Sequence, residues 1–486
     1  MQLKQFIGTV FLFLLIGGCS PSDIAEGEGL IAITNVSLID AKQGQRDNVT
    51  VIWEGNKIKE VVGADAAELP KGATIIDGTG KFLIPGLWDA HVHLTYEQGV
   101  TPAMFKLFLV NGVTSIRDTG GQLDLVKPHK DAAEADPQAS PRVKIAGPLL
   151  DGLPRVYDGS SPFRPNLSEG INSIQKAKNF VAKLDAAGVD LIKAYEMLAP
   201  DVYEAVVAEA TKRGLPVTGH VPLSLDVITA SNAGLRSIEH MRNLEMSCTA
   251  DWEKLLASRR EQLAAGKTEA GGDLRSRLHQ LQRYHAIENQ DATVRDTVLA
   301  TLARNNTWLV PTLTILAFRE NRAYARPEWR EQFKYLPDST HKKWTANAER
   351  LATLPIDSNG VAFAEWGYDM VGRLPAAGVE IMAGTDTPIA LLTPGFSLHE
   401  ELRLLVRSGL TPLQAIEAAT LRPAEYFNMQ DELGTIQGGK LADLLLLDAN
   451  PLDDISNTES IRAVVRDGKL YDRAALDVWL QELEAE

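Results

Sequence analysis

The stretch LWDAHVHL at residues 87–94 combines a short apolar strand with two histidines that are separated by one residue. Seven further apolar segments follow it, and stretches of helical composition lie between them. Alternation of this kind is the signature of parallel βαβ units. Eight such units predict an α/β fold of the (β/α)8 TIM-barrel type. The other candidate strands are GVTSIRDTG (112–120), RVKIAG (142–147), DLIKAYE (190–196), LPVTGHV (215–221), LRSIEHM (235–241), TWLVPTL (307–313) and VEIMAGTD (379–386).

Strand-like runs punctuated by turn residues occupy both ends of the chain. They fill residues 30–84 and recur in residues 432–476. Because these runs flank one long central α/β region, we expect them to pair into a small composite β-sandwich domain. The barrel then extends over residues 85–431.

Two segments of the barrel region, residues 249–304 and 318–376, are too long to be simple crossovers. Both are rich in Glu, Arg, Lys, Gln and Ala, which have good helix propensity. Since they follow the sixth and seventh strands, we expect helical insertions at the carboxyl-terminal face of the barrel. Long insertions are commonly lids or specificity elements. A solvated helical bundle without ligand contact is the alternative.

The first residues of the chain have a different composition from the rest. An apolar run extends from Phe6 to Ile16 and is followed by Cys19. This order is typical of a signal peptide, and the run is shorter than the roughly 20 residues that a membrane-spanning helix needs. We therefore expect residues 1–18 to be a signal peptide and residues 19–29 a tether.

The stretch LIGGCS resembles a bacterial lipobox. That resemblance implies cleavage before Cys19 and lipidation of this residue. Ser20 at the next position implies export to the periplasmic side with an anchor in the outer membrane. The alternative is that Cys19 is the last residue of an ordinary signal peptide.

The overall composition excludes several classes of protein. The chain has 486 residues, of which 44% are hydrophobic, and a formal net charge of −15, with no basic tract. Because phosphate binding needs clustered Lys and Arg, nucleic acid is not an expected partner. Cys248 is the only cysteine besides Cys19, so no internal disulfide is available to a lipidated chain. No neighbouring residue indicates that Cys248 is reactive.

Six polar residues lie at or near the ends of the predicted strands, where barrels of this kind carry their catalytic groups. His91 and His93 point to the same face of their strand. Imidazoles and carboxylates suit Zn²⁺ and related ions. A lysine ammonium only donates hydrogen bonds, so it would need carboxylation by CO₂ to become an oxygen ligand. The six are His91, His93, Lys193, His220, His240 and Asp386.

With these residues in place, the sequence resembles the amidohydrolase superfamily. Within it, the similarity is to imidazolonepropionase-like proteins and to binuclear Xaa-Pro dipeptidases and ochratoxin amidohydrolases. The resemblance covers nearly the whole chain after the signal peptide. It is carried by IPGLWDAHVHL, GVTSIRDTGG, DLIKAYE, VTGHV, SIEHM, AGTDTP, LTPLQAIEAATLRPAEYF and GTIQGGKLADLLLLDANPL.

The resemblance implies a centre of two divalent metal ions, with Zn²⁺ as the family expectation. His91, His93 and Asp386 would hold the more buried ion, and His220 and His240 the more exposed one. Carboxylated Lys193 and a hydroxide would bridge the two ions. Asp386 would also act as the general acid and base. The alternative is a set of buried polar residues that bind no metal.

The chain departs from its relatives after the fifth strand. Many dipeptidase-like relatives carry a Tyr shortly after the fifth-strand histidine, and this chain has none there. Tyr195 lies two residues after Lys193 and is expected on the same strand face, where it either polarises the substrate carbonyl or only lines the barrel mouth. Mononuclear deaminases need His-x-x-Glu, but His220 is followed by Val-Pro-Leu. Deamination is therefore disfavoured.

Further polar residues are weaker candidates. His399 either contacts a ligand or makes a capping or solvent contact near the start of a helix. Arg117 and Asp118 either pair inside the barrel or touch the site. Three arginines in the second insertion either bind a substrate carboxylate together or are solvated, as charged residues on helices mostly are. This arginine fork would consist of Arg319, Arg322 and Arg330.

The leading functional hypothesis is a metal-dependent hydrolase of amide bonds in small molecules such as dipeptides, N-acyl amino acids or cyclic amides. The same centre would also suit esters, lactones or phosphotriesters. A surface lipoprotein that only binds ligands is the alternative from another class. We expect a small-molecule substrate and membrane contact only through the amino-terminal lipid, and the sequence leaves a homo-oligomer open.

Overall fold

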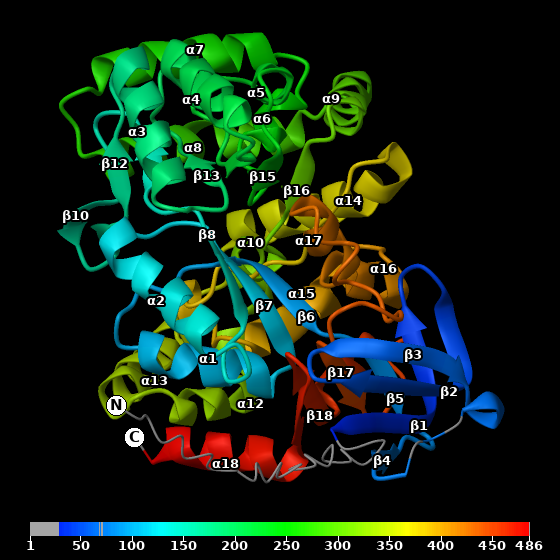
Figure 1. Cartoon of the computed structure of the whole chain (residues 1–486). Helices are drawn as coiled ribbons and strands as arrows, with labels where there is room; N and C mark the ends of the chain where they lie inside the picture. The colour runs from blue at the N-terminus through cyan, green and yellow to red at the C-terminus, as the bar shows by residue number, and fades with distance from the viewer. Residues whose placement is uncertain (1–28, 68, 70, 486) are drawn as a thin grey trace, which may run out of the picture.

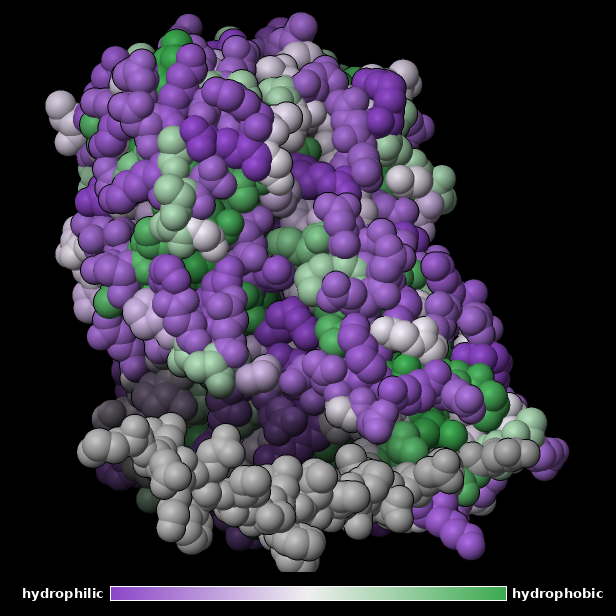
Figure 2. Space-filling model, viewed as in Figure 1, coloured by the Kyte–Doolittle hydropathy of each residue, from purple (hydrophilic) through white to green (hydrophobic). Residues whose placement is uncertain are grey.

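The computed structural model describes residues 29–67, 69 and 71–485. The predicted signal peptide, the lipidation site Cys19 and all but the last residue of the tether lie outside the described residues. Within the described ranges, no helix is long and apolar enough to cross a membrane. The face of the molecule in Figure 2 is mainly hydrophilic, with small separate hydrophobic patches.

The central region contains seven of the eight predicted parallel strands in chain order, and the predicted α/β fold is confirmed. Three of the strands form one sheet, and the others join a second sheet that begins with two short additional strands. The two sheets meet where the Asp190 N–H donates to the Ile145 carbonyl (2.9 Å). The strands are β6 (Leu87–Val92), β7 (Val113–Asp118), β8 (Arg142–Ile145), β13 (Ile192–Ala194), β14 (Val217–Gly219), β15 (Ser237–Glu239) and β16 (Trp308–Val310), with β9 (Leu149–Asp151) and β12 (Ser168–Gly170) as the additions.

The eighth predicted strand is not a regular strand. It makes two isolated parallel bridges, Ile381 to Leu309 and Thr387 to Val92, and thereby joins β16 to β6. Between the bridges the backbone passes close to His91, since a Cβ on Gly384 would lie 2.8 Å from the His91 nitrogen. This close approach permits only glycine, and backbone hydrogen bonds link the segment to β6 on both sides of Gly384, from the Ala90 N–H to the Ala383 carbonyl and from the Asp386 N–H to the His91 carbonyl.

Helices connect the strands and cover the barrel from outside (Figure 1). Several begin with a side-chain cap; Ser173, Asp226 and Asp291 each accept a hydrogen bond from a backbone N–H in the first turn. Their apolar faces pack on the barrel in one continuous core. The helices are α1 (Thr101–Val110), α2 (Leu123–Ala135), α3 (Ile174–Ala186), α4 (Pro200–Lys212), α5 (Val227–Asn232), α6 (Leu244–Ser247), α9 (Ala292–Arg304), α14 (Ser358–Ala377), α15 (Phe396–Arg407), α16 (Pro412–Ala418) and α17 (Leu421–Tyr426).

The two chain ends form one mixed eight-stranded sheet, so their predicted pairing is confirmed. The strands of the predicted sandwich are hydrogen-bonded into one continuous sheet, in which β5 joins β1 to β17. The blue and red strands lie together beside the barrel in Figure 1. They are β1 (Leu30–Asp40), β2 (Gly44–Glu54), β3 (Lys57–Gly63), β4 (Thr74–Asp77), β5 (Phe82–Pro85), β17 (Leu444–Leu447), β18 (Ile461–Arg466) and β19 (Lys469–Asp472).

The long segments after β15 and β16 are helical, as their composition predicts. Each also contains the barrel helix that leads into the next strand, namely α9 and α14. The sequence did not predict the hairpin of β10 (Asp158–Ser161) and β11 (Arg164–Asn166) or the terminal helix α18 (Arg473–Glu484). The added helices are α7 (Trp252–Ala265), α8 (Gly271–Glu288), α10 (Leu313–Leu316), α11 (Phe318–Asn321), α12 (Pro327–Arg330) and α13 (Asp338–Ala352).

Candidate metal centre

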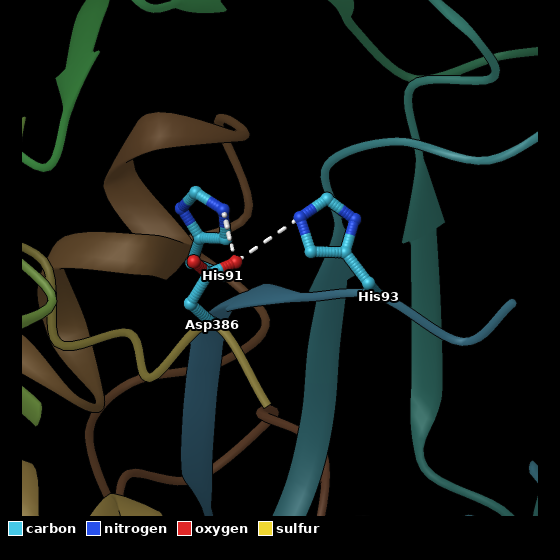
Figure 3. A group of neighbouring side chains, drawn as sticks. All are labelled: His91, His93 and Asp386. Carbon is cyan, nitrogen blue, oxygen red and sulfur yellow. Dashed lines mark ion pairs between the residues drawn. The ribbon is translucent and has the colours of Figure 1, made fainter. Parts of the chain in front are cut away.

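Three of the predicted ligands meet at the mouth of the barrel. Asp386 Oδ1 lies 3.2 Å from His91 Nε2 and 3.1 Å from His93 Nε2. One donor atom from each residue falls within 4.8 Å of the others, and all three residues are buried. Figure 3 shows both imidazoles linked to the same oxygen of the Asp386 carboxylate. Two imidazoles and a carboxylate at this spacing are a donor set that suits Zn²⁺ or a similar divalent ion.

The other predicted ligands lie beside this group. Asp386 Oδ2 is 3.7 Å from His240 Nε2, and the rings of His240 and His220 are 4.8 Å apart. Lys193, His220 and His240 line one cavity together with His93 and Asp386. His91 contacts Asp386 from beneath this cavity. The structure thus brings all six predicted residues into one site.

Each of the four histidines has its Nδ1 engaged by a fixed group. His91 Nδ1 lies 2.5 Å from Glu239 Oε2, and His220 Nδ1 lies 2.6 Å from Glu196 Oε1. His93 Nδ1 lies 2.9 Å from the Gly120 carbonyl, and His240 Nδ1 contacts the Thr312 hydroxyl. Partners of this kind fix the ring and its tautomer in metal sites. Every Nε2 is thereby left for an ion.

Three buried polar atoms at the centre have no hydrogen-bond partner within the described part of the chain. They are His91 Nε2, Lys193 Nζ and Asp386 Oδ1. Leaving such atoms unpaired costs about 1–3 kcal/mol each, so a native protein normally satisfies them. A bound cation would satisfy the imidazole and the carboxylate. The residues present therefore fit a divalent metal centre.

The backbone around the ligands is held by buried hydrogen bonds. Asp89 accepts from the His91 N–H (3.2 Å) and from both the N–H (3.0 Å) and the hydroxyl (2.7 Å) of Thr385. It thus ties the strand of His91 to the segment of Asp386. Asp386 and His240 adopt φ values of 68° and 57°, a left-handed region that L-residues rarely occupy. Such strain concentrates at functional sites, where the surrounding structure enforces it.

Charge and burial set the protonation of the ligands. Burial by itself would raise the pKa of Asp386, but His240 and His91 hold it well below its usual range. Burial lowers the pKa of His220 and of His240 well below their usual values. The aspartate is therefore ionised and these two imidazoles are neutral, which are the forms that bind metal.

Lys193 is enclosed by the barrel and has a perturbed amine. Burial lowers its pKa to about 8. The charge of Glu239 opposes this shift, and the charge of Arg117 adds to it. A lower pKa increases the share of neutral amine near neutral pH, and neutral amine is the form that reacts with CO₂. The environment thus favours the chemistry that a bridging lysine needs.

Tyr195 lines the same cavity as Lys193, as its spacing along the strand predicts. Its ring packs against His220 with a centroid distance of 4.3 Å. Burial raises the pKa of Tyr195 well above its usual value, so the phenol stays protonated. The phenol therefore keeps the proton that a hydrogen-bond donor needs.

The first insertion contributes to the site through α8. His279 Nε2 lies 2.6 Å from Glu196 Oε2, and Arg275 Nε lies 3.3 Å from Glu196 Oε1. Burial alone would raise the pKa of Glu196, but Arg275, His279 and the hydrogen bond from His220 lower it well below its usual range. The carboxylate that orients His220 is thus held from its other side by α8. The first insertion therefore contacts the site and is not a solvated helical bundle.

The weaker candidates have structural contacts. Arg117 donates to Glu239 Oε1 (2.9 Å), and Asp118 accepts from the Leu94 N–H (2.7 Å). Both therefore support the strands that carry ligands without touching the cavity. His399 is buried between Thr458 Oγ1 (2.9 Å) and the Asn111 carbonyl (3.1 Å), so neither expectation for it is correct. Its helix α15 packs closely against the terminal β unit, which removes its ring from both solvent and site.

The predicted arginine fork does not form. Arg319 pairs with Asp357 (3.3 Å) and lines a pocket next to His240, whereas Arg322 donates to backbone carbonyls at the end of α13. Arg330 lies in α12, away from Arg319, and lines neither cavity next to the metal centre. Cys248 is buried, and burial raises the pKa of its thiol to about 12, so it stays protonated.

Sequence reasoning missed the acidic residues that orient the histidines. Glu239 and Glu196 are fully buried carboxylates directly before His240 and directly after Tyr195. An ionised side chain in or next to a buried barrel strand is costly unless it is paired, and that cost is the signal that was available. His279 gave no local signal, because its helix is far from His220 in the sequence.

Comparison with known proteins identifies the family. Residues 82–471 match the profile of the amidohydrolase family, which is more than half of the chain. The chain belongs to the amidohydrolase family. This amidohydrolase is 23% identical to ochratoxinase from Aspergillus niger, over 93% of this chain and 89% of the relative.

Solved structures share the fold of this amidohydrolase. The bottromycin amidohydrolase has a TM-score of 0.68 at 22% identity, covering 93% of this chain and 89% of the other. A Xaa-Pro dipeptidase with methionine bound in its active site has a TM-score of 0.65 at 20% identity, covering 91% and 100%. These likenesses bear on the fold alone.

Glu239→Gln in this amidohydrolase is expected to weaken metal binding by about 10- to 100-fold, because the amide no longer supports His91 and leaves Arg117 without its carboxylate. Competition with a chromogenic chelator measures the affinity. Glu54→Gln, at an exposed pair with Lys59, is the matched control and should leave it unchanged. Equal affinity in both variants would show that Glu239 does not support the ligand.

Proposed function

We propose that this amidohydrolase is a hydrolase of small-molecule amide bonds that works with two divalent metal ions. The observation that carries the proposal is the set of four histidines around Asp386, each with Nδ1 engaged and Nε2 free to face an ion. The family membership and the ochratoxinase relative support amide hydrolysis.

The six ligands divide into two groups that share Lys193. His91, His93 and Asp386 would hold one ion, and His220 and His240 the other. Carboxylated Lys193 would bridge them, since its Nζ is buried within the cavity without a hydrogen-bond partner in the described part of the chain. When bound, such ions lower the pKa of a water molecule and polarise a carbonyl oxygen.

Asp386 is the group suited to move the proton. Its carboxylate is ionised and borders the cavity, so it can accept a proton from the attacking water. The same oxygen can then donate that proton to the leaving nitrogen as the C–N bond breaks, which completes a general base and general acid cycle.

Tyr195 is suited to bind the carbonyl oxygen. Because its phenol is protonated and lines the cavity, it can donate a hydrogen bond as negative charge develops on that oxygen. Glu196 and Glu239 do not touch the cavity; they hold the imidazoles in place.

The test is a screen of purified protein loaded with Zn²⁺, Mn²⁺ or Co²⁺ against dipeptides and N-acyl amino acids, with aryl esters and lactones beside them. We expect amide turnover that is abolished by a chelator and restored by metal, with about two ions per chain by elemental analysis. Turnover of esters or lactones but not of amides would show that the enzyme hydrolyses ester bonds and not the proposed amide bonds. Full amide turnover in metal-free protein would contradict the proposal itself.

A further inference from the structure

The metal cavity is much smaller than the pocket beside it. Its volume is about 30 Å³, which is space for about two water molecules. The neighbouring pocket has a volume of about 180 Å³ and shares His240 and Arg242 with the metal cavity. Ile315, Phe318 and Phe363 line that pocket. A substrate with its carbonyl at the metal centre therefore has room to extend on the side of His240.

Apolar side chains close another side of the metal cavity. This closed wall consists of Leu149, Tyr157 and Leu167, which line the metal cavity but not the neighbouring pocket. Its two leucines are only 1% and 3% exposed. Leu149 packs beside a metal ligand, since a Cβ on Gly120 would lie 2.5 Å from Leu149 Cδ2 and 3.3 Å from His93 Cε1. The wall thus lies directly next to the centre where the reaction would occur.

Hydrogen bonds and packing hold the closed wall in place. The Leu149 N–H donates to the Leu167 carbonyl (3.0 Å), and the Ser168 hydroxyl donates to the Tyr157 carbonyl (2.6 Å). Leu274 of α8 belongs to the same buried apolar cluster. Because protein interiors are close-packed, a bulky group pressed against this wall would force costly shifts of side chains and backbone.

The chemistry of hydrolysis assigns the two halves of the substrate to the two sides. The leaving nitrogen takes its proton from Asp386, whose Oδ2 lies 3.7 Å from His240 Nε2, so the amine half lies on the side of His240. A trans amide directs its two substituents to opposite sides of the C–N bond. The acyl substituent therefore points away from His240, toward Leu149 and Leu167. This orientation rests on the proposed function, which places the carbonyl at the metal ions.

The metal cavity also lacks a partner for a cation on the acyl half. Among the residues that the structure describes, Asp386 is the only carboxylate that lines this cavity, and it belongs to the ligand set. Glu196, which lies behind the cavity, is already engaged by His220 and His279. Arg275 lines the cavity and would repel a second cation. Because a buried ammonium group without a partner is costly, the free amine of a dipeptide is disfavoured here.

We propose that Leu149 and Leu167 limit the acyl half of the substrate to a small neutral group. The substrate class is then an N-formyl or N-acetyl amine, whose larger amine half lies toward the neighbouring pocket. Hydrolysis breaks the C–N bond, adds the water oxygen to the acyl carbon to give formate or acetate, and leaves a water proton on the amine nitrogen. Substrates with a bulky acyl group and dipeptides with a free amino terminus are disfavoured.

Kinetics with one constant amine half test the size limit. Metal-loaded wild type should hydrolyse N-acetylphenylalanine at least about 100-fold faster, as kcat/KM, than N-benzoylphenylalanine, because one methylene in an apolar pocket already changes this value by about 10- to 200-fold. Leu149→Ala and Leu167→Ala open the wall, so each should reduce the ratio to below about 10-fold, mainly through faster hydrolysis of the benzoyl compound. Equal turnover of both compounds by the wild type overturns the inference and leaves the proposed function intact.

Leu184→Ala is the matched control, because Leu184 is also a buried leucine, lies on α3 and lines neither the metal cavity nor the neighbouring pocket. It should keep the wild-type ratio. If an Ala variant fails to fold by circular dichroism, Leu149→Val or Leu167→Val replaces it and should reduce the ratio by less. An unchanged ratio in folded variants of both wall leucines would show that the wall does not set the limit.

A second pair of substrates separates charge from size. Propionyl and glycyl groups have nearly the same shape, but only the glycyl group carries an ammonium. N-propionylphenylalanine should therefore be hydrolysed at least about 10-fold faster than glycylphenylalanine at neutral pH. Equal or faster turnover of the dipeptide would overturn the restriction to neutral acyl groups.

Binding without turnover distinguishes this inference from the proposed function. N-methylphosphonylphenylalanine and N-phenylphosphonylphenylalanine share one amine half and carry a tetrahedral phosphorus in place of the carbonyl carbon. Isothermal titration of metal-loaded wild type should show at least about 10-fold tighter binding of the methyl compound, and Leu149→Ala or Leu167→Ala should narrow this difference. Equal affinities in the wild type overturn the inference. If no amide is hydrolysed but the difference in affinity holds, the size limit stands and the proposed function fails.

Discussion

Asp386→Asn is expected to lower kcat/KM for amide hydrolysis by at least about 10³-fold, because a neutral amide can neither take the proton from water nor complete the ligand set. Asp386 lies 3.2 Å from His91 Nε2 and 3.1 Å from His93 Nε2, so both imidazoles lose their charged partner at once. Steady-state kinetics on metal-loaded protein, together with elemental analysis, measure the two effects.

The fold should survive this change. Asparagine has nearly the volume of aspartate and retains the backbone hydrogen bond from the Asp386 N–H to the His91 carbonyl (2.7 Å). Asp369→Asn, at an exposed pair with Arg373, is the control and should leave kcat/KM unchanged. A folded Asp386→Asn protein with wild-type turnover and metal content would remove Asp386 from both roles.

Lys193→Ala is expected to lower kcat/KM by at least about 10²-fold and to reduce the metal content below two ions per chain, because no bridging oxygen ligand remains. The side chain is fully buried and borders the cavity. Its removal leaves space in which a short carboxylic acid can supply the missing oxygens. Added formate or acetate should therefore restore part of the activity in a concentration-dependent way.

Two observations check the carboxylation itself. Native mass spectrometry of the wild type should show an added mass of one CO₂ that is absent from Lys193→Ala. Reconstitution of metal-free wild type in CO₂-depleted buffer should give less activity than the same procedure with bicarbonate. Lys176→Ala, at an exposed pair with Glu169, is the control for loss of a lysine. An equal loss of activity in that control, or no added mass in the wild type, would argue against a bridging carbamate.

The sequence alone was enough to predict the barrel strands and the positions of the metal-ligand candidates. Seven of the eight predicted barrel strands are regular strands, because apolar runs bounded by Gly and turn residues are local signals. The position of His91, His93, Lys193, His220, His240 and Asp386 at strand ends followed from the same pattern. Parallel strands of a barrel direct their carboxyl ends to one face, so residues far apart in the chain had to meet there.

The eighth strand shows where local reasoning reaches its limit. Its apolar residues predict a strand, but the backbone around Gly384 lies against His91, and isolated bridges join the segment to its neighbours in place of a regular ladder. Asp386 in the same segment adopts a left-handed conformation. Such a conformation is imposed by neighbours from other strands and leaves no mark in residue spacing.

Tertiary structure alone decided which groups surround the metal ligands and what the site can accept. Glu196 orients His220 because α8 presses His279 and Arg275 against it, and Arg283 reaches the pocket beside Arg242 from the same helix. Arg319, which the sequence singled out in the other insertion, lines the same pocket. Ligand positions follow from strand order, which is encoded locally, whereas the pocket beside them depends on how two long insertions pack, and that packing is set by contacts between residues distant in the chain.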